Sequence, residues 1–277
     1  MKFFGLVPLG RVIAIANQKG GVGKTTTAVN LSASLGLAGR STLLIDIDPQ
    51  ASASSGVGLA KADGLPTAYE VIMGEQPATA AIRPAAVQSL SVLPSTRDLI
   101  GAEIELVPMI AREHRLMEAL RSVRDAYDYL IIDCPPSLGL LTINGLTAAD
   151  SLLVPLQCEY YALEGLSALL QTVELIRQRL NTALVIEGLL LTMFDTRNSL
   201  CHQVVEEVRR HFPREVFQTI IPRNVRLSES PSHGLPAVVY DPTSRGAEAY
   251  KALAQEILER NQWRKSRFAE ESEVGGG

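Results

Sequence analysis

The sequence predicts an α/β fold with a doubly wound, mostly parallel sheet that carries helices on both faces. Five short apolar runs do not alternate with polar residues, as expected of strands buried on both faces of a parallel sheet. They lie at residues 12–16, 43–45, 129–132, 152–154 and 189–191. Helix-compatible stretches separate them, at residues 25–37, 112–123, 164–180, 203–211 and 247–260. This alternation is typical of βαβ units, in which ligands bind beyond the carboxyl ends of the strands.

The chain of 277 residues is expected to form one folded domain. Its length suits a single large α/β core, and we find no internal repeat and no linker rich in Pro, Gly or Ser. We expect a short amino-terminal extension over residues 1–10, one domain over residues 11–262, and a flexible carboxy-terminal tail over residues 263–277. Residues 51–64 contain three serines and three glycines, which predicts a mobile loop inside the domain.

The composition indicates a cytosolic protein. The three cysteines, Cys134, Cys158 and Cys201, are scattered and form no CxxC pair, which argues against a disulfide framework. The first ten residues are too short for a signal peptide. No run approaches the roughly 20 apolar residues that a membrane span needs.

Charge is distributed unevenly along the chain. The net charge is -4, yet residues 193–268 carry 12 Lys or Arg against 9 Asp or Glu, a net of +3. A basic carboxy-terminal third can present a positive face to a polyanion. Solvated helix faces explain the same charges equally well, so charge alone does not decide between the two.

A phosphate-binding loop follows the first apolar run. The segment NQKGGVGKTT at residues 17–26 lies between a predicted strand and a predicted helix. Its glycines allow backbone N–H groups to curve around phosphate oxygens, next to the positive end of the helix dipole. A lysine in the position of Lys24 reaches the β- and γ-phosphates, and the Thr25 hydroxyl ligates Mg²⁺. The predicted nucleotide-binding residues are Lys19, Gly20, Gly21, Val22, Gly23, Lys24, Thr25 and Thr26.

One further cation stands in this loop. Gln18 occupies the position of the first glycine in the usual pattern, and Lys19 follows it. Lys24 already fills the role of the lysine that binds the phosphates of its own chain. Lys19 is therefore free to act on a nucleotide bound by a second subunit, in the manner of an arginine finger supplied in trans.

The segment KGGVGKTT resembles the deviant Walker A motif of the ParA/MinD group of ATPases, and the resemblance extends through most of residues 12–260. It implies a P-loop ATPase that binds ATP and Mg²⁺ and dimerises around the nucleotide. In that family the first lysine of the motif, here Lys19, crosses to the nucleotide of the partner subunit. The expected catalytic residues are Lys19, Lys24 and Asp48.

Carboxylates end two of the predicted strands. Asp46 and Asp48 follow the second run, and alternate residues of a strand face the same way. The resemblance implies that Asp48 positions the attacking water and that Asp46 supports the Mg²⁺ shell, although Asp46 suits a capping role equally well. Asp133 ends the third run and matches a Walker B aspartate. The expected metal-binding residues are Thr25, Asp46 and Asp133.

An iron–sulfur reading of Cys134 is not favoured. A related fold carries such a cluster, but a cluster shared across a dimer needs two suitable cysteines in each chain. The surroundings of the three cysteines do not resemble those ligand segments. We interpret all three as ordinary buried thiols.

Two carboxy-terminal segments resemble chromosomal ParA/Soj proteins most closely. They are LTMFDTR at residues 191–197 and IPRNVRLSESPSHG at residues 221–234. The resemblance places Pro222 and Asn224 against adenine, while a Pro-Asn turn that opens a helix describes the same residues. It also implies binding to double-stranded DNA without sequence preference, for which phosphate contacts suffice. The candidate DNA-binding residues are Arg197, Arg223, Arg226, Arg245 and Lys251, with Arg260 as a further possibility.

The resemblance therefore implies a slow, partner-stimulated ATP hydrolase that drives chromosome or plasmid partitioning. Its partners are a second copy of the chain, nucleoid DNA and a ParB-like centromere-binding protein. One alternative is a membrane-cycling ATPase like MinD, which needs an amphipathic helix near residues 256–268. Another is ParA-like positioning of a different cargo. A metabolic enzyme is disfavoured because Ser137 and the four histidines form no triad-like group.

Overall fold

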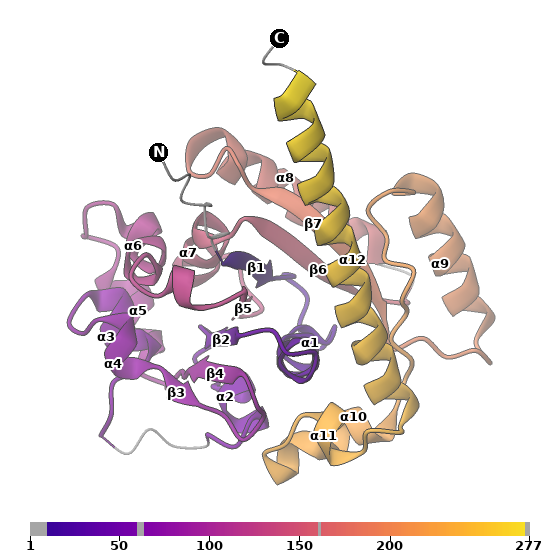
Figure 1. Cartoon of the computed structure of the whole chain (residues 1–277), viewed down its shortest axis with the longest axis horizontal. Coiled ribbons are helices and arrows are strands. Elements are labelled where there is room, and N and C mark those ends of the chain that lie inside the picture. Colours follow the sequence, from indigo (N-terminus) through magenta and orange to yellow (C-terminus); the bar gives the residue numbers. More distant parts are fainter. Residues whose placement is uncertain (1–9, 60–63, 160–161, 275–277) are drawn as a thin grey trace.

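The computed structural model describes residues 10–59, 64–159 and 162–274, with the side chains of residue 164 and of residues 262–274 excepted. Seven strands form one sheet in the order β3-β4-β2-β5-β1-β6-β7 (Figure 1). All neighbouring pairs are parallel except β3 with β4. The strands are β1 (Arg11–Ile15), β2 (Thr42–Asp46), β3 (Arg83–Pro84), β4 (Leu90–Leu93), β5 (Tyr129–Asp133), β6 (Ser151–Gln157) and β7 (Val185–Thr192). The predicted α/β class and mostly parallel sheet are confirmed.

Helices cover both faces of the sheet, as a doubly wound fold requires. Alternate residues of β1 enter two separate hydrophobic clusters: Val12 and Ala14 in one, Ile13 and Ile15 in the other. The second cluster includes α1 (Lys24–Leu37) and α12 (Arg245–Val274), which pack against each other (Figure 1). The first includes α7 (Leu140–Ala148) and α8 (Ala162–Arg179). The central strands are thus buried on both sides, which explains their continuous apolar runs.

Shorter helices complete the structure. Those between β2 and β5 are α2 (Ser52–Gly56), α3 (Ala68–Met73), α4 (Ala78–Ala81), α5 (Leu99–Glu105), η1 (Arg112–His114), α6 (Arg115–Leu120) and η2 (Arg124–Ala126). After β7 come α9 (Ser199–His211), α10 (Val225–Glu229), η3 (Ser230–His233) and α11 (Ala237–Tyr240). Within these described residues, no helix is long and apolar enough to cross a membrane.

Three boundaries differ from the sequence-based prediction. The expected loop over residues 51–64 contains α2, and residues 60–63 lie outside the described part. Gly10 belongs to the folded domain, because it is buried and a side chain there would collide with the carbonyl of Arg124; residues 1–9 of the expected extension are outside the described part. The backbone of α12 stays helical through Val274, where a flexible tail was expected from residue 263. No proline or glycine interrupts residues 247–274, and glycines begin at 275.

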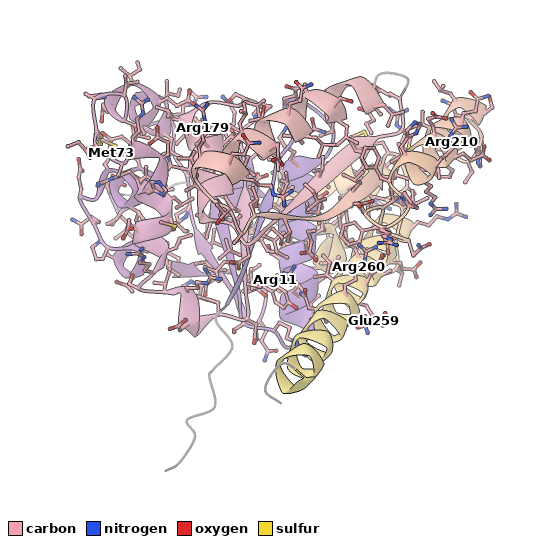
Figure 2. All side chains as sticks on the ribbon, turned by 90° about the horizontal axis from the view of Figure 1, so that it is seen from above. Arg11, Met73, Arg179, Arg210, Glu259 and Arg260 are labelled. Atoms are coloured by element: carbon pink, nitrogen blue, oxygen red, sulfur yellow. The ribbon has the colours of Figure 1, made fainter. Side chains whose placement is uncertain are left out.

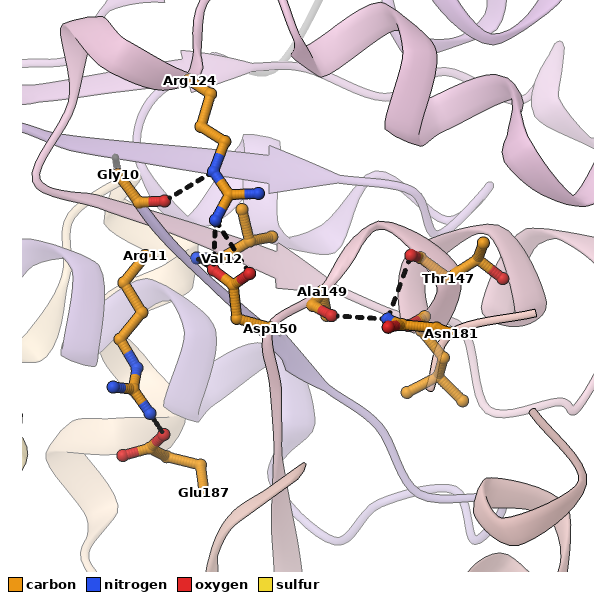
Figure 3. Close-up of polar contacts among 10 residues, drawn as sticks. Gly10, Arg11, Val12, Arg124, Thr147, Ala149, Asp150, Asn181 and Glu187 are labelled. Carbon is orange, nitrogen blue, oxygen red and sulfur yellow. Dashed lines mark hydrogen bonds and ion pairs between the residues drawn. The ribbon is translucent and has the colours of Figure 1, made fainter. Parts of the chain in front are cut away.

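A polar cluster joins the amino-terminal ends of β1 and β6 (Figure 3). The guanidinium of Arg124 donates to both carboxylate oxygens of Asp150 at 2.8 and 2.7 Å and to the Gly10 carbonyl at 2.9 Å. The Val12 N–H donates to the same carboxylate at 2.8 Å. The Asp150 carboxylate therefore accepts from a buried backbone N–H of β1 and also holds Arg124 at the amino-terminal ends of β1 and β6.

Replacing Asp150 by alanine is expected to lower the free energy of unfolding by about 2 kcal/mol, because the buried Val12 N–H loses its acceptor. Asp150→Asn keeps an acceptor oxygen and should lose about half as much. Urea unfolding of the three proteins measures the difference. Equal stability of Asp150→Ala and the unmodified chain would contradict this role.

Candidate functional site

The predicted phosphate loop connects β1 to α1 at the carboxyl edge of the sheet. Gly21 and Gly23 have φ of 74° and 91°, in the left-handed region that favours glycine. The N-cap residue of α1 is Gly23, which has no side chain to accept from the first N–H groups of the helix, and phosphate oxygens can accept from such groups. Neighbouring strands hold the loop, since the Thr192 hydroxyl donates to the Val22 carbonyl at 2.9 Å. The Asn17 amide donates to the Pro155 carbonyl at 2.8 Å.

Lys24 lies at the centre of the site. Its side chain is 6% exposed, and its Nζ donates to the Lys19 carbonyl at 3.0 Å. Burial lowers the pKa of Lys24, while the nearby carboxylates of Asp133 and Asp48 oppose this shift. The fold therefore brings together a lysine and two aspartates that the sequence predicted separately.

Asp133 ends β5 directly beside two other strand ends. In the sheet register it pairs with Ile15 of β1 and with Asp46 of β2. Its carboxylate is fully buried, and within the described part of the chain neither oxygen meets a donor with hydrogen-bond geometry. Burial raises the pKa of Asp133 well above its usual value, although the hydroxyl of Thr25 lies close enough to lower it in part.

These residues fit a Mg²⁺ ion. A buried carboxylate with two unsatisfied oxygens, next to a threonine hydroxyl, is a donor set that a hard cation prefers. The described residues include no group of three or more His, Cys, Asp or Glu side chains placed to hold a metal. Mg²⁺ is usually held by one or two protein oxygens together with phosphates and water, and Asp133 and Thr25 can supply such oxygens.

The Asp46 carboxylate accepts hydrogen bonds from the first turn of α2. One oxygen accepts from the backbone N–H of Ser54 at 2.8 Å and from its hydroxyl at 2.7 Å, and the other accepts from the Asp48 N–H at 3.1 Å. Burial raises the pKa of Asp46 to about 6 despite these hydrogen bonds. This geometry is the capping role that the sequence left open. The contribution of Asp46 to a Mg²⁺ shell stays a prediction.

Asp48 faces the site from the turn after β2. It is 8% exposed, and its Oδ1 accepts from the Gln50 N–H at 2.9 Å. Its carbonyl accepts from the hydroxyl of Ser95 at 2.6 Å, and the Ser95 N–H donates to the Ser54 hydroxyl at 3.0 Å. Sequence reasoning missed Ser95 because β4, which precedes it, is only four residues long and was not predicted.

Because Ser95 fixes the backbone of Asp48, we expect Ser95→Ala to lower the rate of ATP turnover by about fivefold, the equivalent of one hydrogen bond. ATP affinity should change little, since the hydrogen bonds of Ser95 go to Ser54, Asp48 and Thr96 and not to residues of the phosphate loop. Steady-state kinetics with ATP separates the two quantities. Ser91→Ala on β4 is the matched control, and a turnover equal to that control would contradict the assignment.

The predicted adenine residues lie beside the phosphate loop. Pro222 and Asn224 line a cavity of about 180 Å³ together with Gly23, Thr26 and Tyr250. The Asn224 side chain also accepts from a backbone N–H at 2.9 Å and caps α10. Asn224 can therefore cap α10 and line this cavity at the same time. Contact of Pro222 or Asn224 with an adenine base stays a prediction.

Two of the candidate DNA-binding arginines are paired with carboxylates. The guanidinium of Arg197 meets Asp195 at 2.8 Å, and its side chain is 87% exposed. Arg226 meets Glu229 at 2.8 Å and Asp241 at 3.1 Å, so its charge is largely balanced within the chain.

The other candidates differ from these. Arg223 and Arg245 are exposed, and no ion pair among the described residues involves either of them. Lys251 is exposed on α12 and donates to the Pro242 carbonyl at 2.8 Å. Arg197 lies between β7 and α9, whereas Arg223, Arg226, Arg245 and Lys251 lie on or between α9, α10 and α12. DNA contact stays a prediction for each of the five.

Arg260 on α12 is built into the fold (Figure 2). Its guanidinium stacks over the ring of Phe217 with 4.3 Å to the centroid, and it donates to Glu256 at 2.7 Å and to the Val216 carbonyl at 3.1 Å. These contacts favour a structural role over a contact with DNA. The three cysteines are free and buried, as predicted, and burial raises the pKa of Cys134 and Cys158.

The trans-acting candidate, Lys19, lies at the mouth of the loop. Its Nζ meets the carboxylate of Glu159 at 2.5 Å, and the two side chains are 43% and 46% exposed. Glu159 was not singled out in the sequence. Glu159 follows β6, and it comes close to Lys19 because β6 lies next to β1, which leads into the phosphate loop.

Comparison with known proteins identifies the family. Residues 10–186 match the family model described as an AAA domain. The chain is 59% identical over 249 residues to the sporulation initiation inhibitor protein Soj of Bacillus subtilis, covering 90% of this chain and 98% of the relative. It is 56% identical over 257 residues to the chromosome partitioning protein ParA of Myxococcus xanthus, covering 93% and 91%.

A solved structure has the same architecture. The cobyrinic acid a,c-diamide synthase of Mycobacterium smegmatis, crystallised with bound ADP and magnesium, superimposes with a TM-score of 0.80. The two proteins are 37% identical, and the match covers 92% of this chain and 96% of that one. With the phosphate loop, Asp48 and Asp133 in place, the chain belongs to the AAA-domain family and, within it, to the Soj/ParA chromosome-partitioning ATPases.

Proposed function

We propose that this protein is a Mg²⁺-dependent ATP hydrolase that dimerises around ATP and, in that state, binds DNA without sequence preference. The observation that carries the proposal is the grouping of Lys24, Thr25 and Asp48 around the fully buried carboxylate of Asp133. In this assignment Thr25 and Asp133 hold Mg²⁺, which supplies charge neutralisation at the phosphates. Lys24 binds the phosphates of its own chain, and Asp48 positions the attacking water.

Partner residues complete the proposed cycle. Lys19 reaches the nucleotide of the second subunit, so ATP hydrolysis and dimerisation are coupled. A ParB-like protein stimulates turnover and returns the chain to the monomer. DNA binding then acts as a switch, because ATP selects the state in which the basic residues of both chains share one surface. The protein is expected to be cytoplasmic and associated with the nucleoid.

Cosedimentation tests this proposal against a membrane-cycling function. The protein is mixed with random-sequence DNA or with anionic liposomes, in the presence of Mg²⁺ and either a non-hydrolysable ATP analogue or ADP. Salt-sensitive pelleting with DNA only in the presence of the analogue is the expected result. Pelleting with liposomes in place of DNA would assign a membrane-cycling role. If the protein shows the same nucleotide-dependent DNA binding but positions a cargo other than a chromosome or plasmid, the ATPase assignment stays intact and only the cargo changes.

Among the candidate arginines, Arg245 is expected to contribute more to DNA binding than Arg226, because Arg226 is balanced by Glu229 and Asp241. Arg245→Glu should lower DNA affinity and reduce the salt dependence by about one counterion per chain. A glutamate at the start of α12 suits the helix dipole, so folding should not suffer.

Fluorescence anisotropy with a random duplex at several salt concentrations measures this effect. Arg121→Glu is the control, since this arginine at the end of α6 is also exposed and pairs with Glu118, far from α12 in the fold. A salt dependence for Arg245→Glu equal to that of the control would remove Arg245 from the DNA surface.

A further inference from the structure

The ion pair between Lys19 and Glu159 involves a glutamate whose own backbone N–H and carbonyl are both hydrogen-bonded. The Glu159 N–H donates to the Gln157 carbonyl at 2.8 Å, and its own carbonyl accepts from the Ala162 N–H at 3.0 Å. One residue earlier, the Cys158 N–H donates to the Thr192 carbonyl at 3.2 Å, which joins the segment to β7. Glu159 is therefore placed by backbone hydrogen bonds on both sides, unlike a side chain on a free surface loop.

The phosphate loop contacts the start of α8 at a second point. The side-chain amide of Gln18 donates to the Gly165 carbonyl at 3.2 Å. Gln18 stands where the usual phosphate-loop pattern has glycine, which could make no such contact. Two consecutive side chains of the loop thus contact the same chain, Lys19 at Glu159 after β6 and Gln18 at the first turn of α8.

We propose that Glu159 is a positioning residue that holds Lys19 in the single chain and releases it when the dimer forms. This inference rests on the proposed function, in which Lys19 acts on the nucleotide of the partner subunit. Phosphate oxygens across an interface would compete with the Glu159 carboxylate for the ammonium group of Lys19. Dimerisation therefore exchanges a carboxylate of the same chain for phosphate oxygens bound by the other.

The geometry suits an exchange of this kind. Both side chains are close to half exposed, and ion pairs of that exposure are weak enough to break without a large penalty. Glu159 also lines a cavity of about 260 Å³ with Leu163, Leu200 and Glu207. This space allows the carboxylate to turn away once Lys19 has left.

The variant Glu159→Gln keeps the size of the side chain and removes its charge. Each dimer breaks two of these ion pairs, so the dimer Kd measured with Mg²⁺ and a non-hydrolysable ATP analogue should fall by about 2- to 30-fold. The effect should be largest at low salt and shrink as salt screens the pair in the unmodified chain. Analytical ultracentrifugation at low and high salt gives both values. A dimer Kd that is unchanged or higher at low salt would overturn the proposal.

A second measurement examines Lys19 without dimerisation. In nucleotide-free protein, an amine-acylating reagent should modify Lys19 faster in Glu159→Gln than in the unmodified chain, as read by mass spectrometry. Glu207→Gln is the matched control, because Glu207 lines the same cavity but pairs with Arg210. Equal rates of Lys19 modification in Glu159→Gln and in this control would overturn the proposed role of Glu159 in holding Lys19, even if the proposed function holds. Absence of any nucleotide-dependent dimer in the unmodified chain would instead overturn the proposed function.

Discussion

Replacing Lys24 by alanine is expected to abolish tight binding of ATP. Lys24 is buried at the first turn of α1, where its ammonium group faces the phosphate loop and lies near Asp133 and Asp48. Hydrogen bonds to a charged partner contribute roughly 1.5–3 kcal/mol each, so loss of this group should weaken ATP binding by about one to two orders of magnitude. Isothermal titration calorimetry with Mg²⁺ and a non-hydrolysable ATP analogue measures the change.

The matched control for this variant is Lys251→Ala. Lys251 is exposed on α12, and its Nζ donates a hydrogen bond to the backbone carbonyl of Pro242. ATP affinity should be the same in Lys251→Ala and in the unmodified chain. An affinity of Lys24→Ala within about twofold of that control would contradict the phosphate role of Lys24. A thermal melt of each protein separates this result from unfolding.

Replacing Asp48 by alanine is expected to leave ATP bound and to stop its hydrolysis. Among the described residues, the Asp48 carboxylate accepts a single hydrogen bond, from the Gln50 N–H, so its removal disturbs few structural contacts. Positioning or activation of an attacking water contributes typically 10²- to 10⁴-fold, so turnover should fall by at least about 100-fold. Phosphate release and ATP affinity, measured on the same preparation, distinguish loss of hydrolysis from loss of binding.

Asp125→Ala is the control for this experiment. Asp125 is exposed on η2, at the end of the sheet opposite the phosphate loop. Its removal should leave turnover unchanged. Normal turnover of Asp48→Ala would remove Asp48 from the hydrolytic step and direct attention to the other buried carboxylates, Asp46 and Asp133.

Much of the site could be predicted from local sequence because its chemistry is encoded in short segments. The spacing of Gly21, Gly23, Lys24 and Thr25 is set by the turn that a phosphate loop needs, and those residues are adjacent in the chain. Asp133 could be assigned for a similar reason. Asp133 follows four residues, 129–132, whose unbroken apolar run predicts a buried strand. A carboxylate at the end of such a strand is typical of a metal-binding aspartate in a nucleotide site.

Contacts between distant segments were missed. Ser95 reaches the carbonyl of Asp48, and Glu159 reaches Lys19, across 47 and 140 positions of the chain. Neither residue belongs to a recognisable motif. Their positions depend on β4 lying beside β2 and on β6 lying beside β1, which hydrophobic patterns alone do not specify.

The amino-acid sequence by itself determined the fold class, the position of the phosphate loop, the strand that ends at Asp133 and the strand that precedes Asp48. These features follow from the period of apolar residues and from the backbone freedom of glycine, which act over a few residues. Only the tertiary structure decided that Asp46 caps α2, that Arg226 is balanced by carboxylates and that Lys19 is held by Glu159. Those outcomes depend on which side chains the packed sheet brings within hydrogen-bonding distance, and burial then sets the strength of each contact.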